Sequence, residues 1–154
     1  MVMQSESGSR DERFMRMALR EAVKGAGQVS PNPLVGAVAV KNGEVLAKAY
    51  HRKFGDLHAE TALLGKLTPE QAYGSTIYVN LEPCCHVGKT APCTTALIDA
   101  RVKRVVIGLQ DPNPLVNGKG MSLLRNAGID VVSGVCESEA VELLVSGVVY
   151  APRP

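Results

Sequence analysis

The sequence predicts an α/β fold of three layers, α/β/α, in which helices cover both faces of a mixed five-stranded sheet. Two observations support this fold class. Asn42-Gly43, a dipeptide that favours a two-residue turn, lies between two short apolar runs and indicates a hairpin. After about residue 57, segments with strand-like and helix-like apolar spacing alternate. A hairpin contributes antiparallel strands and βαβ units contribute parallel strands, so the expected sheet is mixed.

The first expected element is an amphipathic helix near the N-terminus. It should run from Asp11 to about Lys24, because apolar residues recur there every three or four positions. Gly25 and Gly27 are expected to end it. The residues before it are polar and lack the apolar region of a signal peptide, so 1–10 are expected to form a flexible leader.

A β-hairpin is expected to follow this helix. Pro31 and Pro33 exclude a helix between them, because a proline forces the residue before it into extended geometry. The apolar run over 35–40 is expected to form one strand, and the run over 45–51 its antiparallel partner.

The remainder of the chain is expected to alternate between helices and strands. The expected helices are 58–66, 94–100, 120–126 and 137–145, and the expected strands are 76–81, 103–109 and 129–133. Gly128 stands just after a helix, where a glycine commonly takes the left-handed conformation. No repeat or linker divides the chain, so residues 11–150 are expected to form a single domain.

Composition excludes several functions. The 154 residues include 17 Lys and Arg against 15 Asp and Glu, a net charge of +2 that is too balanced to indicate nucleic-acid binding. Aromatic residues make up 4 %, with no Trp, so few side chains are available to stack on the bases of a nucleic acid. No apolar run approaches the roughly 20 residues that span a bilayer. We therefore expect a soluble, cytoplasmic protein that binds neither nucleic acid nor membranes.

The placement of the cysteines indicates metal binding. Cys84, Cys85 and Cys93 fall within ten residues, and Cys136 lies far from them. A domain of this size without a secretion signal has no need of disulfides. Clustered thiols in an intracellular chain are first interpreted as metal ligands.

Three short segments hold most of the reactive side chains: His58-Ala59-Glu60, Glu82-Pro83-Cys84-Cys85-His86 and Pro92-Cys93. A catalytic zinc site typically has three protein ligands and one open position. His58, Cys84 and Cys93 would supply one imidazole and two thiolates to such a site. Glu60 would then lie beside the open position, where a carboxylate can act as general acid and base.

Helix geometry limits where these residues can lie. Residues two apart on a regular helix point about 200° from each other, so His58 and Glu60 converge only if His58 stands at the entrance of its helix. Cys93 follows Pro92 and opens the next helix, where backbone N–H groups and the helix dipole favour a thiolate. Two helix N-termini are therefore expected to converge on one metal ion.

A structural zinc site is the second interpretation of these residues. It would take Cys85 or His86 as a fourth ligand and leave Glu60 without a role. Adjacent cysteines fit one tetrahedral ion poorly. The pattern H-x-E followed by P-C-x-x-C is typical of zinc deaminases, in which the Glu is general acid and base. This chain matches that pattern except that eight residues, not two, separate the cysteines.

The run EPCCHVGKTAPC, from Glu82 to Cys93, resembles the signature of the pyrimidine deaminases of riboflavin biosynthesis, whose cysteines have this longer spacing. Two further segments match that family, PNPLVG at 31–36 and DPNP at 111–114, so the resemblance covers about residues 11–140. It implies a cytidine-deaminase-like fold and one catalytic zinc ion per chain. It also implies that His58, Cys84 and Cys93 are the ligands and that Glu60 is the proton donor.

The resemblance further implies a substrate and its contacts. The reaction would be hydrolytic deamination of 2,5-diamino-6-(5-phosphoribosylamino)pyrimidin-4(3H)-one to 5-amino-6-(5-phosphoribosylamino)uracil and ammonia. Polar positions in the family's motifs make six residues candidate substrate contacts: Asn32, His51, His86, Lys89, Asp111 and Asn113. For the two asparagines, turn formation beside proline is an equally good explanation. For Lys89, a solvated loop charge is the alternative to a contact with the phosphate.

Other expectations concern partners and rival functions. Most bacterial members of the family continue into an NADPH-dependent reductase domain, and we expect neither that domain nor NADP on this chain. A homo-oligomer, a dimer or tetramer, is expected. Two alternatives remain: a deaminase of another cytosine-, guanine- or adenine-type substrate, and an interaction module built on structural zinc.

Overall fold

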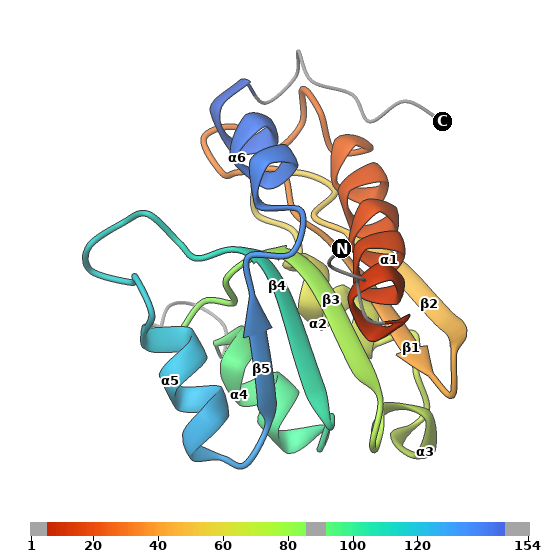
Figure 1. The fold of residues 1–154 in the computed structure, drawn as a ribbon. Helices are drawn as coiled ribbons and strands as arrows, with labels where there is room; N and C mark the ends of the chain where they lie inside the picture. The colour runs from red at the N-terminus through yellow and green to blue at the C-terminus, as the bar shows by residue number, and fades with distance from the viewer. Residues whose placement is uncertain (1–5, 86–91, 147–154) are drawn as a thin grey trace, which may run out of the picture.

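In the computed structural model, five strands form one mixed sheet in the order β2-β1-β3-β4-β5 (Figure 1). The structure describes residues 6–85 and 92–146. The strands are β1 (Gly36–Lys41), β2 (Glu44–Tyr50), β3 (Thr76–Leu81), β4 (Arg104–Leu109) and β5 (Asp130–Ser133). Strand β1 pairs antiparallel with β2 and β3, whereas β3, β4 and β5 run parallel. The predicted mixed sheet is confirmed.

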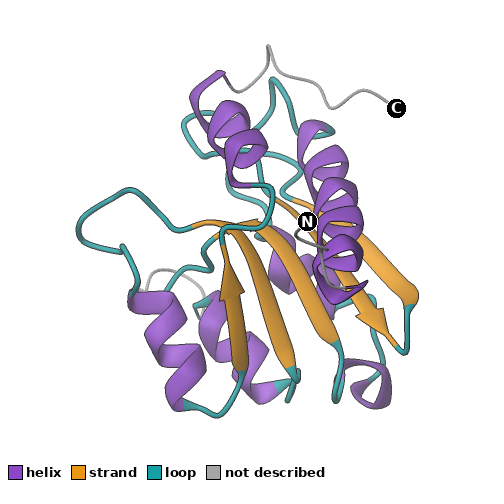
Figure 2. Ribbon diagram, viewed as in Figure 1, coloured by secondary structure: helices purple, strands orange, loops and turns teal. Residues whose placement is uncertain are grey.

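Helices cover both faces of the sheet, as Figure 2 shows. They are α1 (Glu6–Val23), α2 (Ala59–Leu64), α3 (Pro69–Ala72), α4 (Cys93–Asp99), α5 (Lys119–Asn126) and α6 (Glu137–Ser146). One apolar core lies between the sheet and α1 with α6, where Phe14, Leu19 and Leu143 are buried. The second lies between the sheet and α2, α4 and α5, and includes Leu63 and Leu97. The three-layer prediction is therefore confirmed. No helix in the described ranges is both long and apolar enough to cross a membrane.

Local sequence determines the hairpin and the end of α5. Asn42 and Gly43 have φ angles of 53° and 79°, the positive values that a tight hairpin turn requires. Gly128 has φ 88°, and Ile129 N–H donates to Leu124 O at 3.1 Å, which closes the helix end in the predicted way.

Helix α1 begins at Glu6, before the predicted start at Asp11, so residues 6–10 are helical and do not belong to a flexible leader. The prediction was wrong because an established helix gains one hydrogen bond for each residue it adds, and so extends beyond its buried stripe. The five residues before Glu6 lie outside the described residues.

Helix α3 is an element that the apolar spacing does not predict. Gln71 N–H donates to Thr68 Oγ1 at 3.2 Å, and Thr68 N–H donates to Gln71 Oε1 at 2.9 Å. These reciprocal bonds form a capping box, and Pro69 occupies the first helical position. Four helical residues are too few to show a helical period in their apolar spacing. The sequence feature that could have predicted this helix is the run Thr-Pro-Glu-Gln, which is typical of a helix N-terminus.

The carboxyl ends of the parallel strands lie at one edge of the sheet, at the top of the view in Figure 1. Because β1 is antiparallel to β3, the start of β1 and the end of β2 lie at this edge too. Loops from distant parts of the chain therefore meet there, which is where open α/β sheets place their ligand sites.

Candidate metal centre

His58, Cys84 and Cys93 place three potential ligand atoms within 4.8 Å of one another. The Nδ1 of His58 lies 3.3 Å from the Sγ of Cys93 and 3.6 Å from the Sγ of Cys84. In a tetrahedral zinc site with ordinary bond lengths, ligand atoms lie about 3.5 Å apart. The spacing of these three atoms therefore fits a zinc ion.

Each of the three residues stands at the end of a regular element. His58 is the N-cap of α2, with extended backbone angles of φ −66° and ψ 158°, so its side chain precedes the helix. Cys93 is the first residue of α4, after Pro92. Cys84 follows the end of β3. The predicted helix entrances at His58 and Cys93 are confirmed, and two helix N-termini converge on the cluster.

Hydrogen bonds prepare Cys84 to be a ligand. The thiol of Cys93, the imidazole of His58 and the backbone N–H of Cys93, 3.3 Å from the Sγ of Cys84, together lower the pKa of Cys84 to about 4. The donor role of Cys93, together with burial, raises the pKa of Cys93. One imidazole with two sulfurs, one of them already a thiolate, is a donor set that suits zinc.

Glu60 lies in the first turn of α2 and is 4 % exposed. Burial raises the pKa of Glu60 to about 7, against the opposing effect of hydrogen bonds and of His58. A carboxyl group whose pKa lies near neutrality can both take up and release a proton under physiological conditions. Glu60 therefore has the protonation behaviour that an acid–base group needs.

A cavity of about 240 Å³ opens beside the cluster. His58, Glu60 and Cys84 line one part of it, and three of the predicted contact residues, Asn32, His51 and Asp111, also line it. A larger depression of about 750 Å³ lies by Tyr73, Arg101 and Gly128. Among the described residues only the cluster of His58, Cys84 and Cys93 could hold a metal ion, so chemistry rather than size identifies the candidate site.

The buried ring of His51 orients Asn32. Its Nδ1 lies 2.9 Å from Leu57 O, a carbonyl that can only accept, so Nδ1 carries a hydrogen and donates there. The Nε2 then accepts from the Nδ2 of Asn32 at 3.1 Å. With its amide nitrogen engaged in this way, Asn32 keeps its carbonyl oxygen as an acceptor for a group in the cavity.

Asn80 is a polar residue behind the cavity that the sequence interpretation missed. Its Oδ1 accepts from Gly36 N–H at 2.8 Å, and its Nδ2 donates to Leu34 O at 3.0 Å. Pro33 lines the cavity, and these bonds hold the backbone that follows it in place. The signal was an asparagine inside the otherwise apolar end of a buried strand.

Of the other predicted residues that the structure describes, Asn113 and Cys85 do not line the cavity. Asn113 is exposed, and its Oδ1 accepts from Leu115 N–H at 3.0 Å, as the turn interpretation expects. Cys85 is not part of the ligand cluster. His86 and Lys89 lie outside the described residues.

Comparisons with known proteins place the chain among zinc-binding deaminases. A family model described as the cytidine and deoxycytidylate deaminase zinc-binding region matches residues 8–109. The riboflavin biosynthesis protein RibD of Aquifex aeolicus is 53 % identical over 133 residues, which are 86 % of this chain and 37 % of that protein.

Two solved structures agree with this match. The structure of Acinetobacter baumannii RibD has a TM-score of 0.89 and 43 % identity, over 93 % of this chain and 40 % of that one. A Thermotoga maritima protein named as a diaminohydroxyphosphoribosylaminopyrimidine deaminase and 5-amino-6-(5-phosphoribosylamino)uracil reductase has a TM-score of 0.85 and 44 % identity. The match covers 91 % of this chain and 40 % of that protein. This chain thus spans about two fifths of the length of these relatives.

Proposed function

The chain belongs to the cytidine and deoxycytidylate deaminase family with its zinc-binding region, and from this premise we propose that it is the pyrimidine deaminase of riboflavin biosynthesis. The reaction is the hydrolytic removal of the 2-amino group from 2,5-diamino-6-(5-phosphoribosylamino)pyrimidin-4(3H)-one. The observation that carries the proposal is the cluster of His58, Cys84 and Cys93 with Glu60 on the wall of the same cavity. The identity to RibD proteins selects the riboflavin pathway within the family.

We propose His58, Cys84 and Cys93 as the ligands of one zinc ion per chain. When bound, zinc would supply the Lewis acidity that turns water into a nucleophile near neutral pH. Glu60 takes one proton from the attacking water and passes it to a ring nitrogen of the substrate. It then takes the second proton from the hydroxyl group added to the reacting carbon and gives it to the amino group, which leaves as ammonia while the C=O bond forms. Its burial and its pKa of about 7 support this role.

The cavity wall supports recognition of a pyrimidine ring. Asn32 offers a carbonyl oxygen to a ring N–H or an amino group, and His51 holds it in that orientation. Asp111 lines the cavity as well. On sequence grounds His86 and Lys89 remain the proposed contacts of the 5′-phosphate, because a cationic group forms strong hydrogen bonds with a phosphate.

Ammonia release from a substrate panel tests this function. The panel contains the phosphoribosylated diaminopyrimidine, cytidine, deoxycytidylate and guanine, each incubated with zinc-loaded protein. We expect release from the first compound alone. Release from deoxycytidylate or cytidine in its place would assign the chain to another branch of the family, and a structural-zinc module would release ammonia from none of them.

The proposal extends to assembly and location. The family resemblance supports a cytoplasmic homo-oligomer, a dimer or tetramer. Sedimentation of the purified zinc-loaded protein measures the assembly, and a single monomeric species at micromolar concentration would refute it.

A further inference from the structure

Glu82 is a buried carboxylate, 4 % exposed, that lines the cavity but is not part of the candidate ligand cluster. Its backbone N–H donates to Leu109 O, at the last residue of β4, at 2.9 Å, so it continues the pairing of β3 with β4 one residue beyond the end of β3. Cys84 is only two residues further along the chain. Glu82 therefore stands between the edge of the sheet and the candidate metal centre.

The carboxylate of Glu82 accepts three backbone hydrogen bonds from the segment that follows β4. Oε1 accepts from Asp111 N–H at 2.9 Å and from Gly118 N–H at 3.1 Å, and Oε2 accepts from Met121 N–H at 3.2 Å. The first two donors lie at the two ends of the loop over 111–118. The third lies in the first turn of α5.

Helix α5 depends on this carboxylate for its N-terminal cap. Its own N-cap residue, Gly118, has no side chain and makes no side-chain cap bond. A carboxylate at a helix N-terminus satisfies free N–H groups and interacts favourably with the helix dipole. Glu82 supplies this cap from another element, and so it ties α5 to the end of β3.

Close packing at Gly120 reinforces the connection. A Cβ atom at this position would overlap Pro83 O and would lie 3.3 Å from Oε2 of Glu82. The first turn of α5 thus rests directly on the peptide that leads into Cys84. A movement of α5 or of the loop before it would therefore displace that peptide.

The loop itself has few other constraints that would hold Asp111 in place. Its tip is exposed, with Leu115 76 % exposed, and several of its bonds are local, such as Asn113 N–H to Asp111 Oδ1 at 2.9 Å. Gln110 and Asn117 are joined by a side-chain bond near the base of the loop. Glu82 connects that base to the sheet.

We propose that Glu82 is a positioning residue for the deamination, a role that rests on the proposed function. Its carboxylate holds the backbone of Asp111, and with it one wall of the substrate cavity, in place relative to Cys84. Loss of the carboxylate would release this wall without removing a group that touches the reacting atoms. The expected defect is therefore in substrate binding more than in the chemical step.

The test is Glu82→Gln, which keeps the size of the side chain but turns one acceptor into a donor that faces an N–H group. We expect amide hydrogen exchange at Asp111, Gly118 and Met121 to accelerate about tenfold, while exchange at Val79 in the core stays unchanged. KM should rise about tenfold with kcat changed less than about threefold. Zinc content should stay at the wild-type value.

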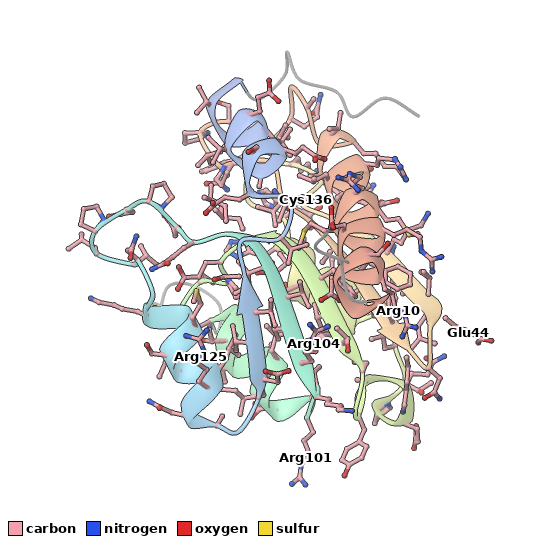
Figure 3. The ribbon with its side chains drawn as sticks, viewed as in Figure 1. Arg10, Glu44, Arg101, Arg104, Arg125 and Cys136 are labelled. Atoms are coloured by element: carbon pink, nitrogen blue, oxygen red, sulfur yellow. The ribbon has the colours of Figure 1, made fainter. Side chains whose placement is uncertain are left out.

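Glu44→Gln is the matched control. Glu44 is exposed at the start of β2, and Figure 3 shows its side chain extending away from the rest of the molecule. The control removes the same charge and should leave exchange and KM as in the wild type. Glu82→Asp keeps two acceptor oxygens on a shorter side chain, and we expect its KM to lie between those of the wild type and Glu82→Gln.

Unchanged exchange at the three amides in Glu82→Gln would overturn the proposal, as would a loss in kcat at unchanged KM. Equal defects in Glu82→Asp and Glu82→Gln would also overturn it, because the acceptor oxygens would then be irrelevant. If Glu82→Gln does not fold, Glu82→Asp is compared with the wild type by the same measurements. If the wild-type protein releases no ammonia, the proposed function is refuted. The exchange experiment does not depend on activity, and it then still tests whether Glu82 holds the loop over 111–118 in place.

Discussion

Glu60 and Cys84 lie close together, and their environments shift their pKa values in opposite directions. Burial raises the pKa of Glu60, whereas donors from Cys93 and His58 lower the pKa of Cys84. The carboxyl group can therefore hold a proton at neutral pH while the thiol has already lost one. This separation suits one residue for proton transfer and the other for metal ligation.

Glu60→Gln should separate the two roles. Glutamine keeps the size of the side chain but cannot carry the proton, so kcat should fall by at least about 100-fold. Zinc content, measured by elemental analysis, should match the wild type because Glu60 is not one of the proposed ligands. Glu44→Gln serves as the control. Wild-type turnover in Glu60→Gln would assign the proton transfer to another group.

Lys89→Ala tests the proposed phosphate contact. The variant should have a KM for the phosphorylated substrate about tenfold above that of the wild type, and nearly wild-type kinetics with the dephosphorylated analogue, because a charge-assisted hydrogen bond is lost only in the first case. Steady-state kinetics on both substrates measure this. Equal losses on both would show that Lys89 acts elsewhere than at the phosphate.

At the scale of elements, single polar side chains tie helices and loops to the sheet. Asp11 of α1 accepts hydrogen bonds from Tyr78 Oη at 2.7 Å and from two nitrogens of Arg104 at 2.8 and 2.7 Å. Figure 3 shows Arg104 on the sheet beside α1. Asn80 ties β3 to the start of β1 in the same manner. Helix α1 and the segment that follows Pro33 thus have defined positions on the sheet.

Asp11 should make stability depend on pH under acidic conditions. Burial tends to raise the pKa of Asp11, but the bonds from Arg104 and Tyr78 outweigh burial and hold that pKa below its ordinary value. The stabilisation is therefore complete above the unfolded pKa of about 4 and is lost as pH falls through the folded pKa. Asp11→Asn should lower the free energy of unfolding at pH 7 by about 2 kcal/mol.

Urea unfolding of Asp11→Asn and the wild type at pH 7 and at pH 2.5 measures this effect. The difference between the two proteins should shrink at the lower pH, because pH 2.5 lies below the unfolded pKa of about 4 and proton binding to Asp11 then favours the unfolded chain. An equal difference at both pH values would contradict the assignment of the stabilisation to the charged carboxylate.

Asn80→Ala should loosen the loop that carries Asn32. The substitution leaves Gly36 N–H and Leu34 O without their partner in a buried place, at a cost of about 2 kcal/mol. Thermal unfolding measures the loss, and faster amide exchange at Gly36 locates it. Asn126→Ala, at an exposed position on α5, is the control and should change neither quantity. Slow exchange at Gly36 in Asn80→Ala would show that another group holds this loop.

At the scale of the whole molecule, the candidate metal centre joins elements that are distant in the sequence. Its ligands come from the start of α2, from the segment after β3 and from the start of α4. An ion bound there would cross-link these elements in the folded chain only. Metal binding is then coupled to folding, because the unfolded chain does not hold the ligands together.

Chelation of the zinc-loaded protein should lower its Tm by roughly 10 °C, given a binding contribution of about 4 kcal/mol and a shift of a few degrees per kcal/mol. Differential scanning calorimetry with and without chelator measures the shift, and added zinc should reverse it. Cys136→Ala should respond as the wild type does, whereas Cys84→Ala should respond little. A Tm independent of chelator would refute metal binding at this centre.

The sequence by itself determined where the strands and the longer helices lie along the chain, the turn at Asn42-Gly43, and the positions of His58 and Cys93 at helix entrances. These features depend on apolar spacing and on residue preferences within a few positions, so they can be derived from a local stretch of chain. The ligand candidates could be named for the same reason, since their motifs are short.

Only the tertiary structure decided which side chains and backbone groups from separate segments meet. The three donors to Glu82, the two bonds of Asn80 and the orientation of Asn32 by His51 each join parts of the chain that no local pattern relates. It also placed Asp111 at the cavity and Asn113 away from it, although the two residues share one motif. The physical reason is that a hydrogen bond depends on distance and direction, and these are set between distant segments only when the sheet and its helices pack.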